Sequence, residues 1–146
     1  MNRIIHSIGT ILLLSINLIS AEIELTASVT QNPVADDEQF IYQVEVTGKT
    51  QNLPDISLPD FSEFRVVGGP SSSTSIQMIN FKVSATRTYT VALMPRKKGT
   101  FEIGPASVEY QGKTYTSKAI KLTVVAGTGQ QKPPSSQSSD QSRQPD

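Results

Sequence analysis

The stretch of sequence that decides the fold is 81-FKVSATRTYTVAL-93, in the middle of the chain. Its odd positions are mostly apolar, namely Phe81, Val83, Ala85, Arg87, Tyr89, Val91 and Leu93. Its even positions, from Lys82 to Ala92, are mostly small or polar. Alternation with a period of two is typical of a β-strand that buries one face. The stretch therefore predicts a strand whose odd positions face a core, with Arg87 as the exception among them.

The preceding residues predict the partner of this strand. Residues 73–78 also alternate between polar and apolar side chains. A tight turn at Asn80-Phe81 would form the pairs Ile79–Lys82, Met78–Val83, Ile76–Ala85 and Thr74–Arg87. Apolar residues then meet on one face, which is how strand register is fixed. Phe81 is poorly suited to the positive φ that a two-residue hairpin turn requires, so a longer loop is the alternative.

Further short alternating segments predict strands on both sides of this hairpin. They lie near residues 23–29, 40–47, 64–67, 101–103, 106–110 and 115–124, and Gly104-Pro105 bends the chain between two of them. The proline-rich segment 53–60 suits neither a helix nor a strand ladder, and predicts an extended crossover whose apolar residues pack inward. About seven strands without helical periodicity predict an all-β, immunoglobulin-like, two-sheet Greek-key β-sandwich over residues 22–126. Its core is expected to depend on Val44, Tyr89, Leu93 and Phe101.

The two ends of the chain differ from this pattern. Arg3 and His6 precede an apolar run from Ile8 to Ile19, and Ser20-Ala21 then meets Glu22. This order predicts a signal peptide over residues 1–21, with an uncleaved anchor as the alternative. Residues 127–146 are rich in Ser, Gln and Pro and contain no large apolar side chain, so they predict a disordered linker or tail.

Composition excludes several classes of function. Lys+Arg and Asp+Glu are both 13, so no basic field for nucleic acid is expected. The chain has no Cys, and its only His lies in the predicted signal. No nucleophile elbow or phosphate loop is present. We therefore expect no enzyme, no cofactor and no catalytic residue, although paired carboxylates are not excluded by composition.

Three charged features are candidates for function. Asp36-Asp37-Glu38 could suggest calcium, but the spacing of a calcium loop is missing, which favours a solvated turn and no metal. Arg87 is interpreted as structural, with its stem packed and its head paired with Asp60 or Glu63 or in water. The turn Arg96-Lys97-Lys98 is either a solvated turn or a partner-binding contact.

The chain also resembles a known family in a series of short motifs. They are 38-EQF-40, 58-LPDF-61, 64-FRVVGGP-70, the segment 71–79, 87-RTYT-90, 95-PRKKGTF-101, 104-GPA-106 and 112-GKTY-115. In this order and spacing they are similar to the N-terminal region of BatD, the oxygen-tolerance (aerotolerance) family of bacterial Bat operons. The turn that usually reads Asn-Gly in the family reads Asn80-Phe81 here.

The resemblance implies an exported envelope protein, in the periplasm or at the periplasmic face of the inner membrane. The implied function is a protein-binding module of the Bat system, acting with membrane proteins that carry von Willebrand A domains and with a MoxR-type ATPase. Membrane association would come only through a C-terminal part missing here or through partners. An adhesin-like or glycan-binding sandwich is the alternative, and aromatic residues on exposed loops would favour it.

Overall fold

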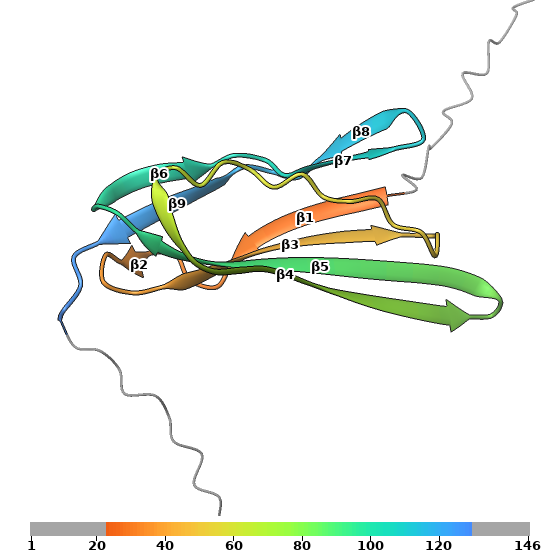
Figure 1. The fold of residues 1–146 in the computed structure, drawn as a ribbon, viewed down its shortest axis with the longest axis horizontal. Helices are drawn as coiled ribbons and strands as arrows, with labels where there is room; N and C mark the ends of the chain where they lie inside the picture. The colour runs from red at the N-terminus through yellow and green to blue at the C-terminus, as the bar shows by residue number, and fades with distance from the viewer. Residues whose placement is uncertain (1–22, 130–146) are drawn as a thin grey trace, which may run out of the picture.

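Nine strands and no helix make up residues 23–129, which are the residues that this computed structural model describes. The expected signal peptide at 1–21 and residues 130–146 of the expected tail lie outside the described residues. Figure 1 shows the strands in layers that run lengthwise, with one long hairpin extending beyond the rest. The expected all-β sandwich is therefore confirmed.

The largest sheet holds four antiparallel strands in the order β1-β3-β5-β4. Their bounds are Ile23–Val29 for β1, Phe40–Gly48 for β3, Lys82–Pro95 for β5 and Phe64–Ile79 for β4. β3 alternates strictly between buried and half-buried residues, as the period-two pattern requires. β3 and β5 are the central strands, and β1 and β4 lie at the two edges.

Two smaller sheets form the opposite side of the sandwich. One has the order β2-β9-β6, with β2 at Val34–Ala35, β9 at Ile120–Val125 and β6 at Gly99–Ile103. The other is a hairpin of β7, Ser107–Tyr110, and β8, Lys113–Thr116. β2 pairs with β9 in parallel, whereas the other paired strands are antiparallel.

The core lies between these layers. Its main cluster includes Tyr42, Val44 and Leu93 from the large sheet and Ile103 and Leu122 from the small one. All five side chains are fully buried. The crossover residues Ile56, Leu58 and Phe61 pack against the same cluster, as the sequence predicts. Tyr89 and Phe101 are only half-buried, so their expected places in the core are corrected to its margin.

The region that the sequence divides into two strands is one long strand in the structure. β4 continues from Phe64 through Gly68-Gly69-Pro70 to Ile79, with register shifts on both sides of Gly68. Bulges of this kind let a strand bend without ending. Gly69 has φ +83°, and a Cβ there would lie 2.8 Å from the carbonyl oxygen of Thr90, so only glycine fits. These glycines follow the strand expected near residues 64–67, and they bend that strand instead of ending it.

The turn of the β4–β5 hairpin has two residues, so the alternative of a longer loop is wrong. Asn80 and Phe81 have φ values of 50° and 62°. Ile79 pairs with Lys82 and Met78 with Val83, as predicted. The register continues through Ile76–Ala85 and Thr74–Arg87, which confirms the pairing read from the alternation.

Candidate functional site

The cationic turn 96–98 joins β5 to β6 and is exposed, but much of its charge is engaged by the domain itself. Arg96 donates from Nε to the carbonyl oxygen of Phe64 at 3.2 Å. Lys97 lies 3.6 Å from a carboxylate oxygen of Glu63 and 5.7 Å from the centre of the Phe101 ring. Lys98 has no ion pair within residues 23–129. Binding of a partner by this turn stays a prediction. Fewer of its cations are available for a partner than the sequence suggests, because Arg96 and Lys97 already contact the domain.

Arg87 pairs with a residue that the sequence analysis does not name. Its guanidinium lies 3.1 Å from the Asp55 carboxylate and donates to Thr74 Oγ1 at 3.3 Å. The expected partners are wrong: Glu63 pairs with Lys97, and Asp60 accepts from the backbone N–H of Ser62. Because the Asp55 side chain is 96% exposed, water screens the pair, and its contribution is about 1 kcal/mol or less. The pair ties the crossover to the long hairpin.

The acidic turn Asp36-Asp37-Glu38 binds backbone amides of its own chain. Asp36 accepts from the N–H of Gly127 at 2.8 Å, and Asp37 accepts from the N–H of Gly129 at 3.1 Å. The two carboxylates therefore hold the chain just after β9, and the contacts continue past the expected boundary at residue 126. Within residues 23–129 no group of three or more potential metal-ligating side chains is found.

Tyr42 is an unexpected polar group in the core. Its side chain is fully buried and packs edge-on against Phe61, with the ring centres 5.2 Å apart. Its hydroxyl has no hydrogen-bond partner among the described residues. Burial raises the pKa of Tyr42 from 10.0 to about 12, because the apolar surroundings disfavour the charged phenolate.

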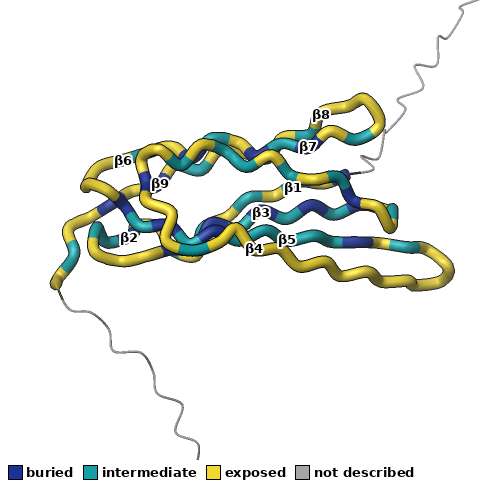
Figure 2. The backbone as a smooth tube through the Cα atoms, viewed as in Figure 1, coloured by how far each residue is buried: buried dark blue, intermediate teal, exposed yellow. Residues whose placement is uncertain are grey.

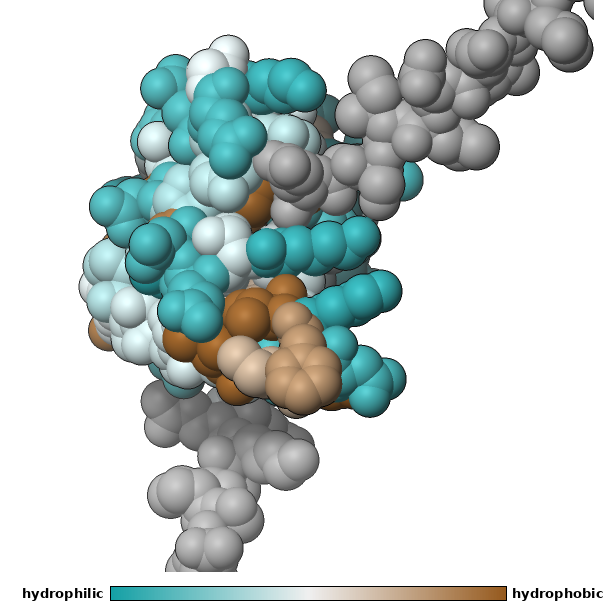
Figure 3. Space-filling view, turned by 90° about the vertical axis from the view of Figure 1, so that its right-hand side faces the viewer, coloured by the Kyte–Doolittle hydropathy of each residue, from teal (hydrophilic) through white to brown (hydrophobic). Residues whose placement is uncertain are grey.

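Sequence reasoning located the end of the β4–β5 hairpin but missed that its apolar side chains are exposed. We call Ile76, Met78, Ile79 and Phe81 the hairpin patch; their exposed fractions are 57%, 63%, 66% and 99%. Figure 2 shows that the end of this hairpin is exposed, and Figure 3 shows apolar side chains gathered there among hydrophilic ones. The sequence gives two indications for Phe81: the alternation assigns it to the buried face, whereas the predicted turn at Asn80-Phe81 leaves its side chain without neighbours. The structure follows the second, and the ring is exposed on the turn.

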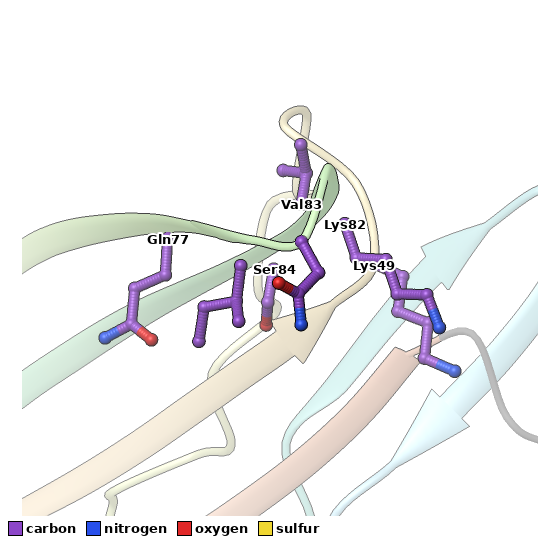
Figure 4. A pocket seen from close by; sticks show the side chains of 7 residues that line it. Lys49, Gln77, Lys82, Val83 and Ser84 are labelled. Atoms are coloured by element: carbon purple, nitrogen blue, oxygen red, sulfur yellow. The ribbon is translucent and has the colours of Figure 1, made fainter.

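An open hollow of about 580 Å³ lies beside this hairpin patch. Its lining residues are Lys49, Gln77, Ile79, Asn80, Lys82, Val83 and Ser84. Figure 4 shows the side chains of Lys49 and Lys82 extending in the same direction from different segments of the chain. The hairpin end is thus an apolar surface bordered by cations.

The edge of β4 is a second uncovered feature. β4 pairs with β5 on one side and with no other strand of the described residues on its other side. Residues 71–79 are all exposed and include no charged residue and no proline. Natural sheets usually guard a free edge with charges, prolines or a covering element, because unpaired backbone groups attract other strands. The opposite edge strand, β1, lies beside β7 and β8 instead.

Comparison with known families identifies the domain. The profile described as BatD DUF11 like domain matches residues 27–124, which span β1 to β9. The chain belongs to the BatD family. It is therefore a protein of a cell-envelope family, as the resemblance of its motifs implies.

Curated proteins offer no further comparison, because none matches this BatD-family chain. Within residues 23–129 no helix of the length and apolarity needed to cross a membrane is found. The motifs on which the resemblance rests fall largely in structural positions: 64-FRVVGGP-70 forms the bulged part of β4, and Gly104-Pro105 separates β6 from β7.

Proposed function

We propose that this domain is a non-enzymatic, periplasmic protein-binding module of the Bat aerotolerance system. The single observation that carries the proposal is the free edge of β4 over residues 71–79. Membership of the BatD family supports the setting. The partners we propose are Bat proteins with von Willebrand A domains, acting with a MoxR-type ATPase.

The binding mode we propose is addition of a partner strand to β4. An extended segment can pair with an exposed sheet edge through main-chain hydrogen bonds, while its side chains supply specificity. Ser71 to Ser75 have small side chains that let another backbone approach. Nothing in the sequence of this edge opposes such pairing, since it lacks the charges that would repel or cap an added strand.

The test uses proline to remove one outward amide from the edge. Successive residues of an edge strand point their N–H groups alternately to the neighbouring strand and to solvent. Of the two single variants Ser72→Pro and Ser73→Pro, one therefore leaves the β4–β5 ladder intact. The variant that keeps the wild-type melting temperature is the one whose replaced N–H points to solvent, and we call it the outward variant.

That outward variant is then measured for binding to a purified Bat protein with a von Willebrand A domain. Loss of affinity by about tenfold or more is expected, because the partner strand loses a main-chain hydrogen bond and meets the ring of proline. Lys98→Glu, in the cationic turn between β5 and β6, is the control: its affinity should stay close to wild type if the β4 edge is the contact. Unchanged affinity in the proline variant would show that the β4 edge is not the contact.

A further inference from the structure

The β4–β5 hairpin projects beyond the sheet to which it belongs. Ile23, Gly48, Ala85 and Ile76 form the last row in which all four strands are paired. Beyond that row, residues 77–84 pair only with each other. Figure 1 shows this overhang as the hairpin that extends past the neighbouring strands. It is a narrow projection with solvent around it.

The turn at its end holds one residue, Phe81, in a backbone conformation that its residue type disfavours. A two-residue turn with positive φ at both positions favours Asn-Gly, because glycine adopts that conformation without strain. Asn80 fits, but Phe81 holds φ at 62° with a side chain that is 99% exposed. No packing within residues 23–129 compensates for the strain. Strain of this kind at an exposed position points to a role outside the fold.

The charges beside this turn have one sign. Lys49 and Lys82 line the hollow next to Ile79, and no carboxylate lies among the lining residues or in the overhang 77–84. Long lysine stems can lie along apolar side chains while their ammonium groups reach outward. The tip therefore combines an aromatic ring, aliphatic side chains and two cations.

We propose that this tip docks on an anionic lipid surface, with Phe81 entering the interfacial layer and Lys49 and Lys82 contacting the headgroups. A protein interface of usual size buries roughly 800 Å² on each partner, which needs a broader surface than three residue pairs and a turn. A bilayer interface accepts a narrow apolar wedge without a matching pocket. Apolar side chains beside lysines are the combination that binds at such interfaces.

The two ends of the described chain lie at opposite ends of the domain. Ile23, the first described residue, lies in the last fully paired row, at the tip end. The cationic turn 96–98 and the end of β9 lie at the other end, because β5 runs away from the tip. The domain would therefore stand on the membrane with its β4 edge upright and open to a neighbouring protein.

The test places a fluorophore at the tip of the exported, purified chain. The chain has no Trp, so Phe81→Trp introduces a single reporter that reads the environment of the turn alone. With vesicles of phosphatidylethanolamine and phosphatidylglycerol, its emission should shift to shorter wavelength. Val125→Trp, at the exposed end of β9, is the control and should not shift.

Charge reversal and ring removal complete the test. Lys49→Glu with Lys82→Glu should weaken vesicle binding of the Phe81→Trp reporter chain about tenfold or more, since each lysine near an anionic surface contributes. High salt and pure phosphatidylcholine vesicles should weaken it as well. In vesicle sedimentation, Phe81→Ala should bind less than the parent chain. A reporter emission that vesicles leave unchanged, or that shifts only with an added protein partner, would overturn the proposal.

Discussion

Replacing Phe81 by Gly should make the domain more stable, although it removes the largest side chain of the hairpin patch. The ring is 99% exposed, so its loss gives up almost no buried surface. A non-glycine residue in the left-handed region costs roughly 1–3 kcal/mol, and glycine removes that cost. Glycine also loses more chain entropy on folding, by roughly 0.5–1 kcal/mol. The net expectation is a gain of about 1 kcal/mol in the free energy of unfolding.

The assay is chemical and thermal unfolding of the parent chain and two variants. For a domain of this size, a gain of about 1 kcal/mol raises the melting temperature by about 4 °C. Phe81→Ala is the matched control: it removes the ring but keeps Cβ, and with it the strain. It should stay within about 0.5 kcal/mol of the parent, as exposed substitutions usually do.

The comparison between these two variants decides whether the turn is strained. If Phe81→Gly is no more stable than Phe81→Ala, the φ of 62° carries no strain energy. Strain at the turn would then give no support to an external role for Phe81. If Phe81→Gly is more stable than the parent and also fails to bind vesicles, then Phe81 lowers the stability of the domain and is needed for vesicle binding.

The further predictions concern four other parts of the chain. Tyr42→Phe should raise the free energy of unfolding by about 1 kcal/mol at neutral pH, because a buried hydroxyl without a partner is removed; lower stability would mean that the hydroxyl is bonded. The free energy of unfolding of the parent should also fall as the pH rises from about 10 to about 12, because Tyr42 loses its proton in the unfolded chain at a lower pH than in the folded one. In Tyr42→Phe the contribution of this residue to the fall should be absent. Phe101→Ala should cost about 1.5–3 kcal/mol by denaturant unfolding, less than a fully buried Phe, because the ring is half-buried against Phe64; a cost under about 0.5 kcal/mol would place it outside the core. Reversing all three cations of the turn 96–98 to Glu should slow association with a Bat partner at low salt, and salt-independent rates would exclude the turn as a contact; this variant should also melt earlier, because Arg96 loses its bond to Phe64 and a Glu at position 97 repels Glu63, whereas Lys98→Glu alone should leave the melting temperature nearly unchanged. N-terminal sequencing of the exported chain should find cleavage near Ala21; a chain that still begins at the first Met would indicate an anchor.

The register of the long hairpin was readable from the sequence because apolar residues on both strands share one period. Ile76 meets Ala85 and Met78 meets Val83 only if the turn falls at residues 80–81. The same alternation does not show how far along the hairpin the opposite layer of the sandwich extends. Phe81 continues the apolar alternation of β5, yet it lies beyond the last row that the core covers. Burial depends on the opposite layer, which local alternation does not describe.

The partners of charged residues were not readable for a related reason. Arg87 takes Asp55 rather than Asp60 or Glu63, and the choice depends on how the crossover runs over the sheet. The continuity of β4 through 68-GGP-70 was also missed. A bulge and a strand end use the same residues, Gly and Pro, and only pairing with β5 on both sides distinguishes them.

The opposite placement of the two described ends has a mechanical consequence. The chain joins the domain at Ile23 beside the hairpin tip and leaves past β9 at the other end, as Figure 1 shows. A pulling force between those points runs parallel to the strands. The seven residue pairs between β1 and β3 would then be loaded together in shear, instead of being peeled apart one after another. Because these pairs would have to break together, the domain should resist stretching between Ile23 and Gly129 more strongly than a domain whose strands are peeled apart.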